Sequence, residues 1–142
     1  MVLDEVIDRY HEAANEFSRG DPGPIKQLFS HRDDVMLANP FGPAASGWGP
    51  ASEALDYASS RFRDGAVTAF DEVARYVGTE LAVIHEKEQW QAKVGGADEL
   101  SQFGLRVTTT FRYEDGDWKI IHRHADPITT ADAMGPVRRS SS

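Results

Sequence analysis

A few side chains in this sequence have the chemistry to move a proton, bind an anion or hold a metal ion. His85 lies in the middle of a strand-like run, and an unperturbed histidine has a pKa of about 6.5, near working pH. Arg123 offers a planar guanidinium that suits a carboxylate or enolate oxygen. His122 and His124 are two positions apart, so on a strand they would project from one face, as metal ligands can.

Each of these side chains also has a purely structural interpretation. His85 can be a partly buried histidine whose hydrogen bonds are satisfied inside the protein. Arg123 can form an internal ion pair with an acid such as Glu86 or Asp71, because an unpaired buried charge is costly. For His122 and His124 we favour a subunit interface, so the sequence predicts no metal site.

Asn39 precedes Pro40 at the end of a short strand-like segment, within a stretch rich in proline and glycine. Its side-chain oxygen can cap a turn, which is a common use of asparagine. It can equally form a hydrogen bond with a ligand carbonyl or hydroxyl. Both interpretations place it in an irregular loop.

A predicted β-hairpin positions most of these groups. The runs Leu105–Tyr113 and Trp118–Ala125 are rich in β-branched and aromatic residues, and the turn between them contains Gly116, which tolerates a positive φ. Side chains alternate between the two faces of a strand. One face therefore carries Arg106, Thr108, Thr110, Trp118, Ile120, His122 and His124, and the other Val107, Thr109, Phe111, Ile121, Arg123 and Ala125.

Hydrophobic periodicity predicts helices in the first half of the chain and long strands in the second. Apolar residues recur at helical spacing from Leu3 to Phe17, and Gly20 is a suitable stop. The other expected elements are a short helix over 24–29, a short strand over 34–38, a helix from Pro50 to about Gly65 that bears Leu55, Ala58 and Phe62, and strands over 67–77 and 81–94.

This order of elements predicts an α+β fold, because helices and strands are segregated along the chain. Long strands joined by tight turns pair antiparallel. A strongly twisted antiparallel sheet with three helices packed on its concave side would form a cone that encloses a pocket. The chain length suits one domain, over residues 1–130, followed by a flexible tail of small, polar and basic residues over 131–142.

The composition excludes several classes of function. Lys and Arg total 15 against 23 Asp and Glu, so the net charge of -8 argues against nucleic acid or an anionic membrane as partner. There is no cysteine, hence no thiol nucleophile and no disulfide framework. The chain has neither a signal-peptide pattern nor a long apolar run, which predicts a cytoplasmic protein. Phosphate-loop, dinucleotide and nucleophile-elbow motifs are absent.

Three motifs resemble those of a known family. They are ANPFG (Ala38–Gly42), the Gly47–Trp48 pair, and EDGDWKIIHRHAD (Glu114–Asp126), the last of which is similar to the closing hairpin of the calcium/calmodulin-dependent kinase II association domain. On these motifs, residues 3–128 resemble the nuclear-transport-factor-2-like superfamily, in its SnoaL-like and ketosteroid-isomerase-like branch. The resemblance implies a cone-shaped fold. It does not imply one function, since the superfamily includes enzymes, binding domains and assembly domains.

The resemblance also implies which hairpin face lines the pocket. In such relatives the opposite face packs against a second subunit, so a homodimer is expected. The implied pocket residues are Asn39, Val83, His85, Val107, Thr109, Phe111, Ile121 and Arg123, with Phe17, Phe41, Trp48 and Phe62 as apolar walls. The implied interface residues are Arg106, Thr108, Trp118, His122 and His124.

Departures from the family pattern argue against two reactions known in the family, ketosteroid isomerisation and epoxide hydrolysis. Asn39 stands where a ketosteroid isomerase has its aspartate base, and an amide cannot accept a proton at neutral pH. Thr109 replaces the acid that helps to hold the oxyanion. The tyrosine expected on the first helix falls near Ala13, one turn from Tyr10. Arg123 stands where limonene epoxide hydrolases have an aspartate, so their way of activating water is also absent.

The predicted function is therefore binding of a small organic molecule that bears a carbonyl or carboxylate, in a largely apolar pocket. The alternative is a SnoaL-like isomerase, cyclase or dehydratase without cofactor, with His85 as proton shuttle and Arg123 stabilising negative charge. A second alternative is a non-catalytic dimerisation module. The expected partners are a small molecule and a second copy of the chain, with no nucleic acid or membrane.

Overall fold

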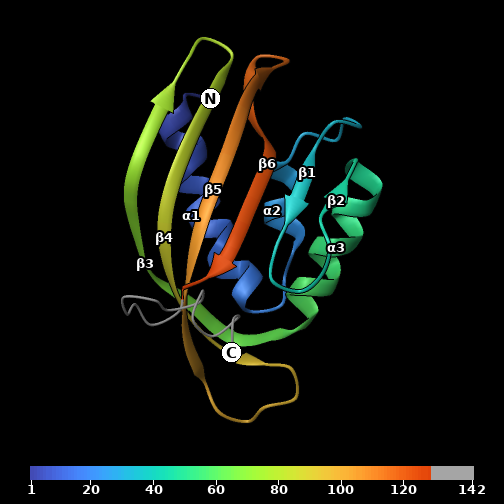
Figure 1. Ribbon diagram of the computed structural model, residues 1–142, viewed down its shortest axis with the longest axis vertical. Helices are drawn as coiled ribbons and strands as arrows, with labels where there is room; N and C mark the ends of the chain where they lie inside the picture. The colour runs from blue at the N-terminus through green and yellow to red at the C-terminus, as the bar shows by residue number, and fades with distance from the viewer. Residues whose placement is uncertain (129–142) are drawn as a thin grey trace, which may run out of the picture.

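The computed structural model describes residues 1–128, which form one mixed α+β arrangement (Figure 1). The strands belong to one sheet in the order β2-β1-β6-β5-β4-β3, in which only β1 and β6 are parallel neighbours. The predicted fold class is confirmed, while the predicted tail over 131–142 lies outside the described residues. In chain order the elements are α1 (Leu3–Ser18), α2 (Gly23–Leu28), β1 (Met36–Ala38), β2 (Ala45–Ser46), α3 (Trp48–Ser60), β3 (Phe62–Val77), β4 (Leu81–Val94), β5 (Ser101–Glu114) and β6 (Asp117–Pro127).

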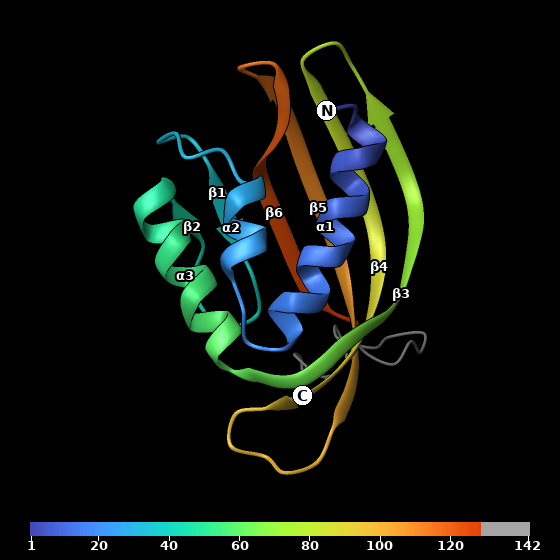
Figure 2. The same cartoon turned by 180° about the vertical axis from the view of Figure 1, so that it is seen from behind.

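The helices all cover the same face of the sheet (Figure 2). Helix α1 lies along the long strands, α2 and α3 lie beside it, and β3 curves from the end of α3 around the ends of the helices (Figure 2). This twisted, open sheet with helices on its concave side is the cone that the sequence predicts. No helix within residues 1–128 is long and apolar enough to cross a membrane.

Helix α1 presents its predicted stripe to the sheet. Val6, Ile7, Tyr10, Ala13 and Ala14 are all buried, as the i, i+3, i+4 spacing requires of one helix face. The helix ends two residues before Gly20, whose φ of 97° suits a glycine after a helix terminus.

The boundary between α3 and β3 differs from the prediction. Helix α3 ends at Ser60, and Phe62 is the first residue of β3 rather than part of the helix. Gly65 does not end a helix but lies within β3, where a Cβ atom would approach the carbonyl oxygens of Ser18 and Gln91 to 2.5 and 2.8 Å. The close approach of α1 to the sheet, not the end of a helix, is therefore what requires glycine at this position.

The hairpin between β5 and β6 confirms the predicted turn, with φ values of 53° at Asp115 and 80° at Gly116. A β-bulge then changes the facing of the second strand. Thr110 pairs with His122 but Phe111 pairs with Ile120, so Ile121 is an extra residue without a partner.

In the part of β6 between the turn and Ile121, the bulge places the side chains on the face opposite to the predicted one. Ile120 is fully buried beside Phe111. Trp118 pairs with Tyr113 and packs against the core beneath the helices, whereas the alternation predicted it on the outer face. On the other side of the bulge, Arg123 and Ala125 keep their predicted inward direction.

Two clusters of buried side chains form the core. The first joins α1, α2 and β1 to the middle of the sheet, with Tyr10, Phe29 and Phe111 among its largest members. The second surrounds Phe62 and Trp90, where the C-terminal part of α1 meets the start of β3 and the end of β4. Burial of apolar surface in both clusters is the main driving force that holds the helices to the sheet.

Candidate functional site

A cavity of about 220 Å³ opens between the helices and the sheet, beside the second core cluster. Every helix contributes to it, as do the Asn39–Phe41 loop and strands β3 to β6. Its lining is overwhelmingly apolar. The lining residues are Tyr10, Ala14, Phe17, Ile25, Asn39, Pro40, Phe41, Leu55, Ala58, Phe62, Trp90, Val94, Phe103, Leu105, Arg123, Ala125 and Pro127.

An aromatic group forms one wall of the cavity, and Phe62 is at its centre. Its ring centroid lies 5.4 Å from that of Phe41, 5.3 Å from that of Trp90 and 6.0 Å from that of Phe103. Phe17 meets Trp90 edge to face, with centroids 6.4 Å apart. Interlocked rings of this kind make a rigid apolar surface.

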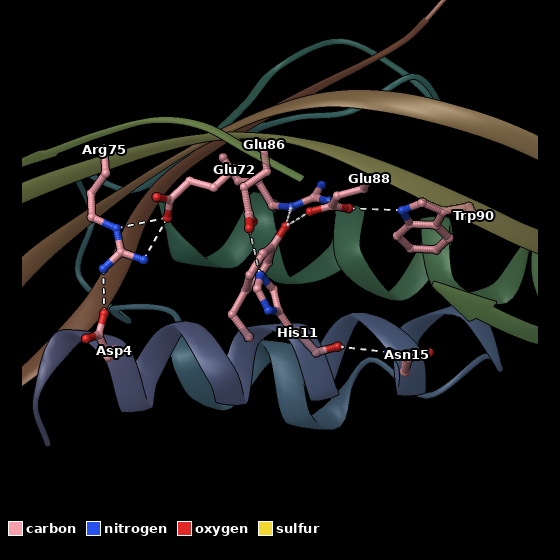
Figure 3. Close-up of polar contacts among 10 residues, drawn as sticks. Asp4, His11, Asn15, Glu72, Arg75, Glu86, Glu88 and Trp90 are labelled. Carbon is pink, nitrogen blue, oxygen red and sulfur yellow. Dashed lines mark hydrogen bonds and ion pairs between the residues drawn. The ribbon is translucent and has the colours of Figure 1, made fainter. Parts of the chain in front are cut away.

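A buried hydrogen-bond network supplies the polar end of the cavity. The Tyr10 hydroxyl donates to Glu88 Oε2, and Arg123 Nε donates to the Tyr10 oxygen at 3.0 Å. Glu88 Oε1 accepts from Trp90 Nε1 at 2.9 Å and from Arg123 Nη2 at 3.3 Å, and Figure 3 shows the first of these contacts. With three donors on its two oxygens, Glu88 acts as an acceptor only, as an ionised carboxylate does.

The protonation states of this network follow from its burial and its charges. Burial raises the pKa of Tyr10 well above its ordinary value, and the negative charge of Glu88 adds to the effect against the opposing charge of Arg123. Burial would lower the pKa of Arg123, but its contacts with Tyr10 and Glu88 outweigh burial and raise it. At neutral pH, Tyr10 is therefore a neutral phenol and Arg123 a cation.

A second buried carboxylate, Glu86, lies two residues before Glu88 on the same face of β4. Glu86 is 2 % exposed, and its Oε2 lies 2.8 Å from His11 Nε2 of α1 (Figure 3). Its Oε1 and the hydroxyl of fully buried Thr109 have no hydrogen-bond partner within residues 1–128. The His11 ring stacks on Phe70 with centroids 3.8 Å apart.

Part of the predicted pocket lines this cavity. Asn39 and Arg123 are its polar members, and Phe17, Phe41 and Phe62 are among its aromatic ones. The Asn39 side-chain oxygen also accepts from the Phe41 backbone N–H at 3.0 Å, as expected for an asparagine that caps a turn.

His85 and Val83 do not line the cavity, contrary to the prediction. On β4 the inward residues are Ile84, Glu86 and Glu88, so His85 points to the outer face, where its Nδ1 lies 2.8 Å from Thr108 Oγ1. The strand and its alternation were predicted correctly, but the phase of the alternation was wrong. Glu86 and Glu88 are charged but point inward, so the sequence pattern of β4 marks its buried face as the solvent-exposed one.

Other predicted pocket residues lie in the core. Val107 and Phe111 are inward and buried, as is Thr109, but none of them lines the cavity. Ile121 is displaced by the bulge and packs partly buried against the first core cluster. Trp48 stacks on His31 with centroids 4.0 Å apart and likewise does not reach the cavity.

The outer face of the sheet carries four of the five predicted interface residues, namely Arg106, Thr108, His122 and His124, because the bulge moves Trp118 to the other side. The Thr110 hydroxyl lies 3.1 Å from His122 Nδ1, and His124 Nε2 lies 3.0 Å from Asp126. Within residues 1–128, no group of three or more His, Cys, Asp or Glu side chains is arranged to hold a metal ion.

Sequence reasoning missed Tyr10, Glu88, Trp90 and Phe103 as parts of the site. A signal for Tyr10 was present, because it belongs to the buried stripe of α1 and a buried hydroxyl needs a partner. Nothing in the sequence indicated that Glu88 is that partner, since the contact joins residues 78 positions apart.

Comparison with known proteins relates both fold and sequence to one family. The chain is similar to a nuclear-transport-factor-2-like superfamily protein from Salmonella enterica serovar Typhimurium (20 % identity, 92 % of each chain, TM-score 0.75). It is also similar to a ketosteroid isomerase-like protein from Erwinia carotovora atroseptica (17 % identity, 91 % of this chain and 95 % of that one, TM-score 0.74). A third similar structure, a nuclear-transport-factor-2-like protein of unknown function from Pseudomonas putida, has 18 % identity over 90 % of this chain and 85 % of that one, with a TM-score of 0.67.

At these identities the solved structures establish the fold alone. No match to this sequence was found among curated proteins. The family model for the SnoaL-like domain matches residues 3–129, which agrees with the extent of the resemblance read from the motifs. The chain therefore belongs to the SnoaL-like domain family, and it has the fold of nuclear-transport-factor-2-like proteins.

Proposed function

We propose that this protein binds a small, largely apolar organic molecule in the cavity between the helices and the sheet. The observation that carries the proposal is an apolar cavity with one cationic side chain, Arg123, at its lining. Sites of this kind combine apolar walls with a few polar groups that orient the ligand. An apolar cavity of roughly 150 Å³ holds benzene, so about 220 Å³ suits a somewhat larger molecule.

Binding is better supported than proton-transfer catalysis. Among the described residues that line the cavity, the ionisable ones are Tyr10 and Arg123. The pKa of each is raised above the ordinary value for its side chain. Neither can accept a proton at neutral pH. The enzymatic alternative through His85 loses its support because that side chain lies on the outer face.

A cavity-filling variant tests the proposal without disturbing the polar network. Ala58 is buried on α3 and lines the cavity, so Ala58→Leu should occupy ligand space. The matched control is Ala74→Leu, at a position of β3 that pairs with outward His85. A library of small ketones, esters and aromatic compounds is screened by thermal shift, because a ligand that binds the native state raises Tm.

The expected result is that compounds which raise Tm for the wild type and for Ala74→Leu fail to do so for Ala58→Leu. Direct titration calorimetry on the best compound then measures the loss of affinity. Equal affinity for all three proteins would place the ligand elsewhere and refute the cavity as its site.

The outer face of the sheet favours a second proposal, association of two copies of the chain. Tyr76 on β3 and Leu81 on β4 are 69 % and 51 % exposed, and Thr108 and His122 lie on the same face. Aromatic side chains are enriched in subunit interfaces, so the exposed ring of Tyr76 supports the proposal. Sedimentation velocity should give a dimer for the wild type and a monomer for Thr108→Asp, and a monomeric wild type would refute the proposal.

A further inference from the structure

The hydrogen-bonding capacity of the cavity lining restricts the ligand further, on the premise that the proposed binding function holds. Arg123 uses Nε for Tyr10 and Nη2 for Glu88. Its Nη1 forms no hydrogen bond with residues 1–128, and it is not among the fully enclosed atoms that lack a partner. On a side chain that lines the cavity, Nη1 is therefore a free donor.

Asn39 contributes a second donor. Its Oδ1 accepts from the backbone N–H of Phe41 at 3.0 Å, which fixes the orientation of the amide because only the oxygen can accept from an N–H. The Nδ2 group then remains free to donate. Asn39 lines the cavity and is half-buried, so this donor is available at its surface.

The other polar side chains of the lining have no free acceptor. The Tyr10 hydroxyl donates to Glu88 and accepts from Arg123, so it is engaged in both roles. The Trp90 N–H is used by Glu88, and an indole offers no acceptor. Apart from the second lone pair of Asn39 Oδ1, which already accepts from Phe41, the polar side chains of the lining therefore offer only donors to a ligand.

The charge of Arg123 is already balanced from within the protein. Glu88 is fully buried, and its Oε1 lies 3.3 Å from Arg123 Nη2. Glu86, also buried, adds negative charge close enough to raise the pKa of Arg123. A carboxylate ligand would bring a further anion beside these two, and a buried charge without its own counter-ion is costly.

We propose that the cavity selects uncharged apolar molecules that carry a carbonyl-type acceptor oxygen, and that it discriminates against the corresponding carboxylates and alcohols. A carbonyl oxygen can accept from Arg123 Nη1 or Asn39 Nδ2 and brings no donor of its own that would need a partner. An alcohol would bury an O–H donor whose one acceptor side chain in the lining, Asn39 Oδ1, already accepts from Phe41, which weakens binding.

A matched series of ligands tests this selection. Acetylnaphthalene, naphthylethanol, ethylnaphthalene and naphthoate share one aromatic body and differ in the polar group. Their dissociation constants are measured by titration calorimetry at pH 7 with the full chain. The expected result is that the ketone binds about tenfold or more tightly than naphthoate, and more tightly than the alcohol or the hydrocarbon.

The possible outcomes separate the two proposals. Naphthoate or naphthylethanol binding as tightly as the ketone would overturn the selection for neutral acceptors while leaving the cavity as a ligand site. Binding by none of the four compounds would overturn the proposed function itself, and the selection with it.

A variant isolates the contribution of charge. Glu88→Gln removes the counter-ion of Arg123 at nearly constant shape, so the preference for ketone over naphthoate should shrink about fivefold or more. Glu80→Gln, at an exposed position in the β3–β4 turn, is the matched control and should leave the preference unchanged. Circular dichroism verifies the fold of both variants. If folded Glu88→Gln keeps the full preference for ketone over naphthoate, Glu88 is not what excludes the carboxylate. If this variant does not fold, the four ligands measured on the wild type still test the selection.

Discussion

The hydroxyl of Tyr10 on α1 donates a hydrogen bond to Glu88 on β4, 78 positions later in the chain. Both side chains are fully buried, and Arg123 of β6 contacts each of them. One polar network thus joins the first helix to two strands of the sheet beside the cavity. Buried polar groups stabilise a fold only when every member is satisfied, so each part of this network is sensitive to substitution.

Tyr10→Phe should destabilise the protein by about 1.5–3 kcal/mol, because Glu88 loses a donor and Arg123 loses an acceptor in a buried, charged network. Urea denaturation at pH 7 measures the free energy of unfolding. The control is Tyr57→Phe, at a side chain 55 % exposed, which should change stability by less than about 0.5 kcal/mol. Equal stability of the two variants would show that the Tyr10 hydroxyl is not engaged.

Arg123→Met should cost about 3–5 kcal/mol, since it leaves the buried Glu88 carboxylate without its cation. The double variant Arg123→Met/Glu88→Gln should be less destabilised than the sum of the two single changes, because it removes both charges. Denaturant unfolding of all four proteins completes a double-mutant cycle.

Arg75→Met is the contrasting change for this cycle. Arg75 forms ion pairs with Glu72 and Asp4 at the surface (Figure 3), where solvent screens the charges. Its loss should cost no more than about 1 kcal/mol. Additive effects of Arg123→Met and Glu88→Gln, or a similar cost for Arg75→Met, would refute the coupling between Arg123 and Glu88.

Gly65→Ala should destabilise the fold by about 1–3 kcal/mol, because its Cβ would clash with backbone oxygens of Ser18 and Gln91 that cannot move independently. Gly96→Ala is the matched control, since a Cβ there meets no atom within 4 Å and its φ is not positive. Thermal unfolding compares the two. A tolerated Gly65→Ala would mean that α1 does not approach the sheet so closely.

His122 should titrate below an ordinary histidine. Its pKa is lowered first by burial and then by the charge of His124. Because the unfolded state binds this proton more readily, the contribution of His122 to stability is present above pH 6.5 and is lost as pH falls through its lowered pKa. NMR titration of the imidazole carbons gives the pKa directly.

His124→Gln removes the neighbouring charge and should therefore raise the pKa of His122 toward its ordinary value. His122→Gln should make the loss of stability between pH 7 and pH 5 less steep, because the group that takes up the proton is gone. An ordinary pKa for His122 in the wild type would contradict both expectations.

The elements of this fold could be predicted because their signals are local. The stripe of α1 from Val6 to Ala14 recurs with the period of a helix, and Gly116 marks the turn of the hairpin. The bulge at Ile121 has no comparable signal, since an extra residue in a strand is defined only by what its partner strand leaves unpaired. Trp118 was therefore assigned to the wrong face, while Arg123 was assigned to the right one.

The amino-acid sequence by itself determined the family, the order of helices and strands, and the alternation that places Arg123 and His122 on opposite faces. Only the tertiary structure decided that His85 points outward and that Glu86 and Glu88 point inward. The physical reason is that alternation specifies two faces but not which one is covered. A carboxylate can be buried only where distant residues, here Tyr10, Trp90 and Arg123, supply its hydrogen bonds and its counter-charge.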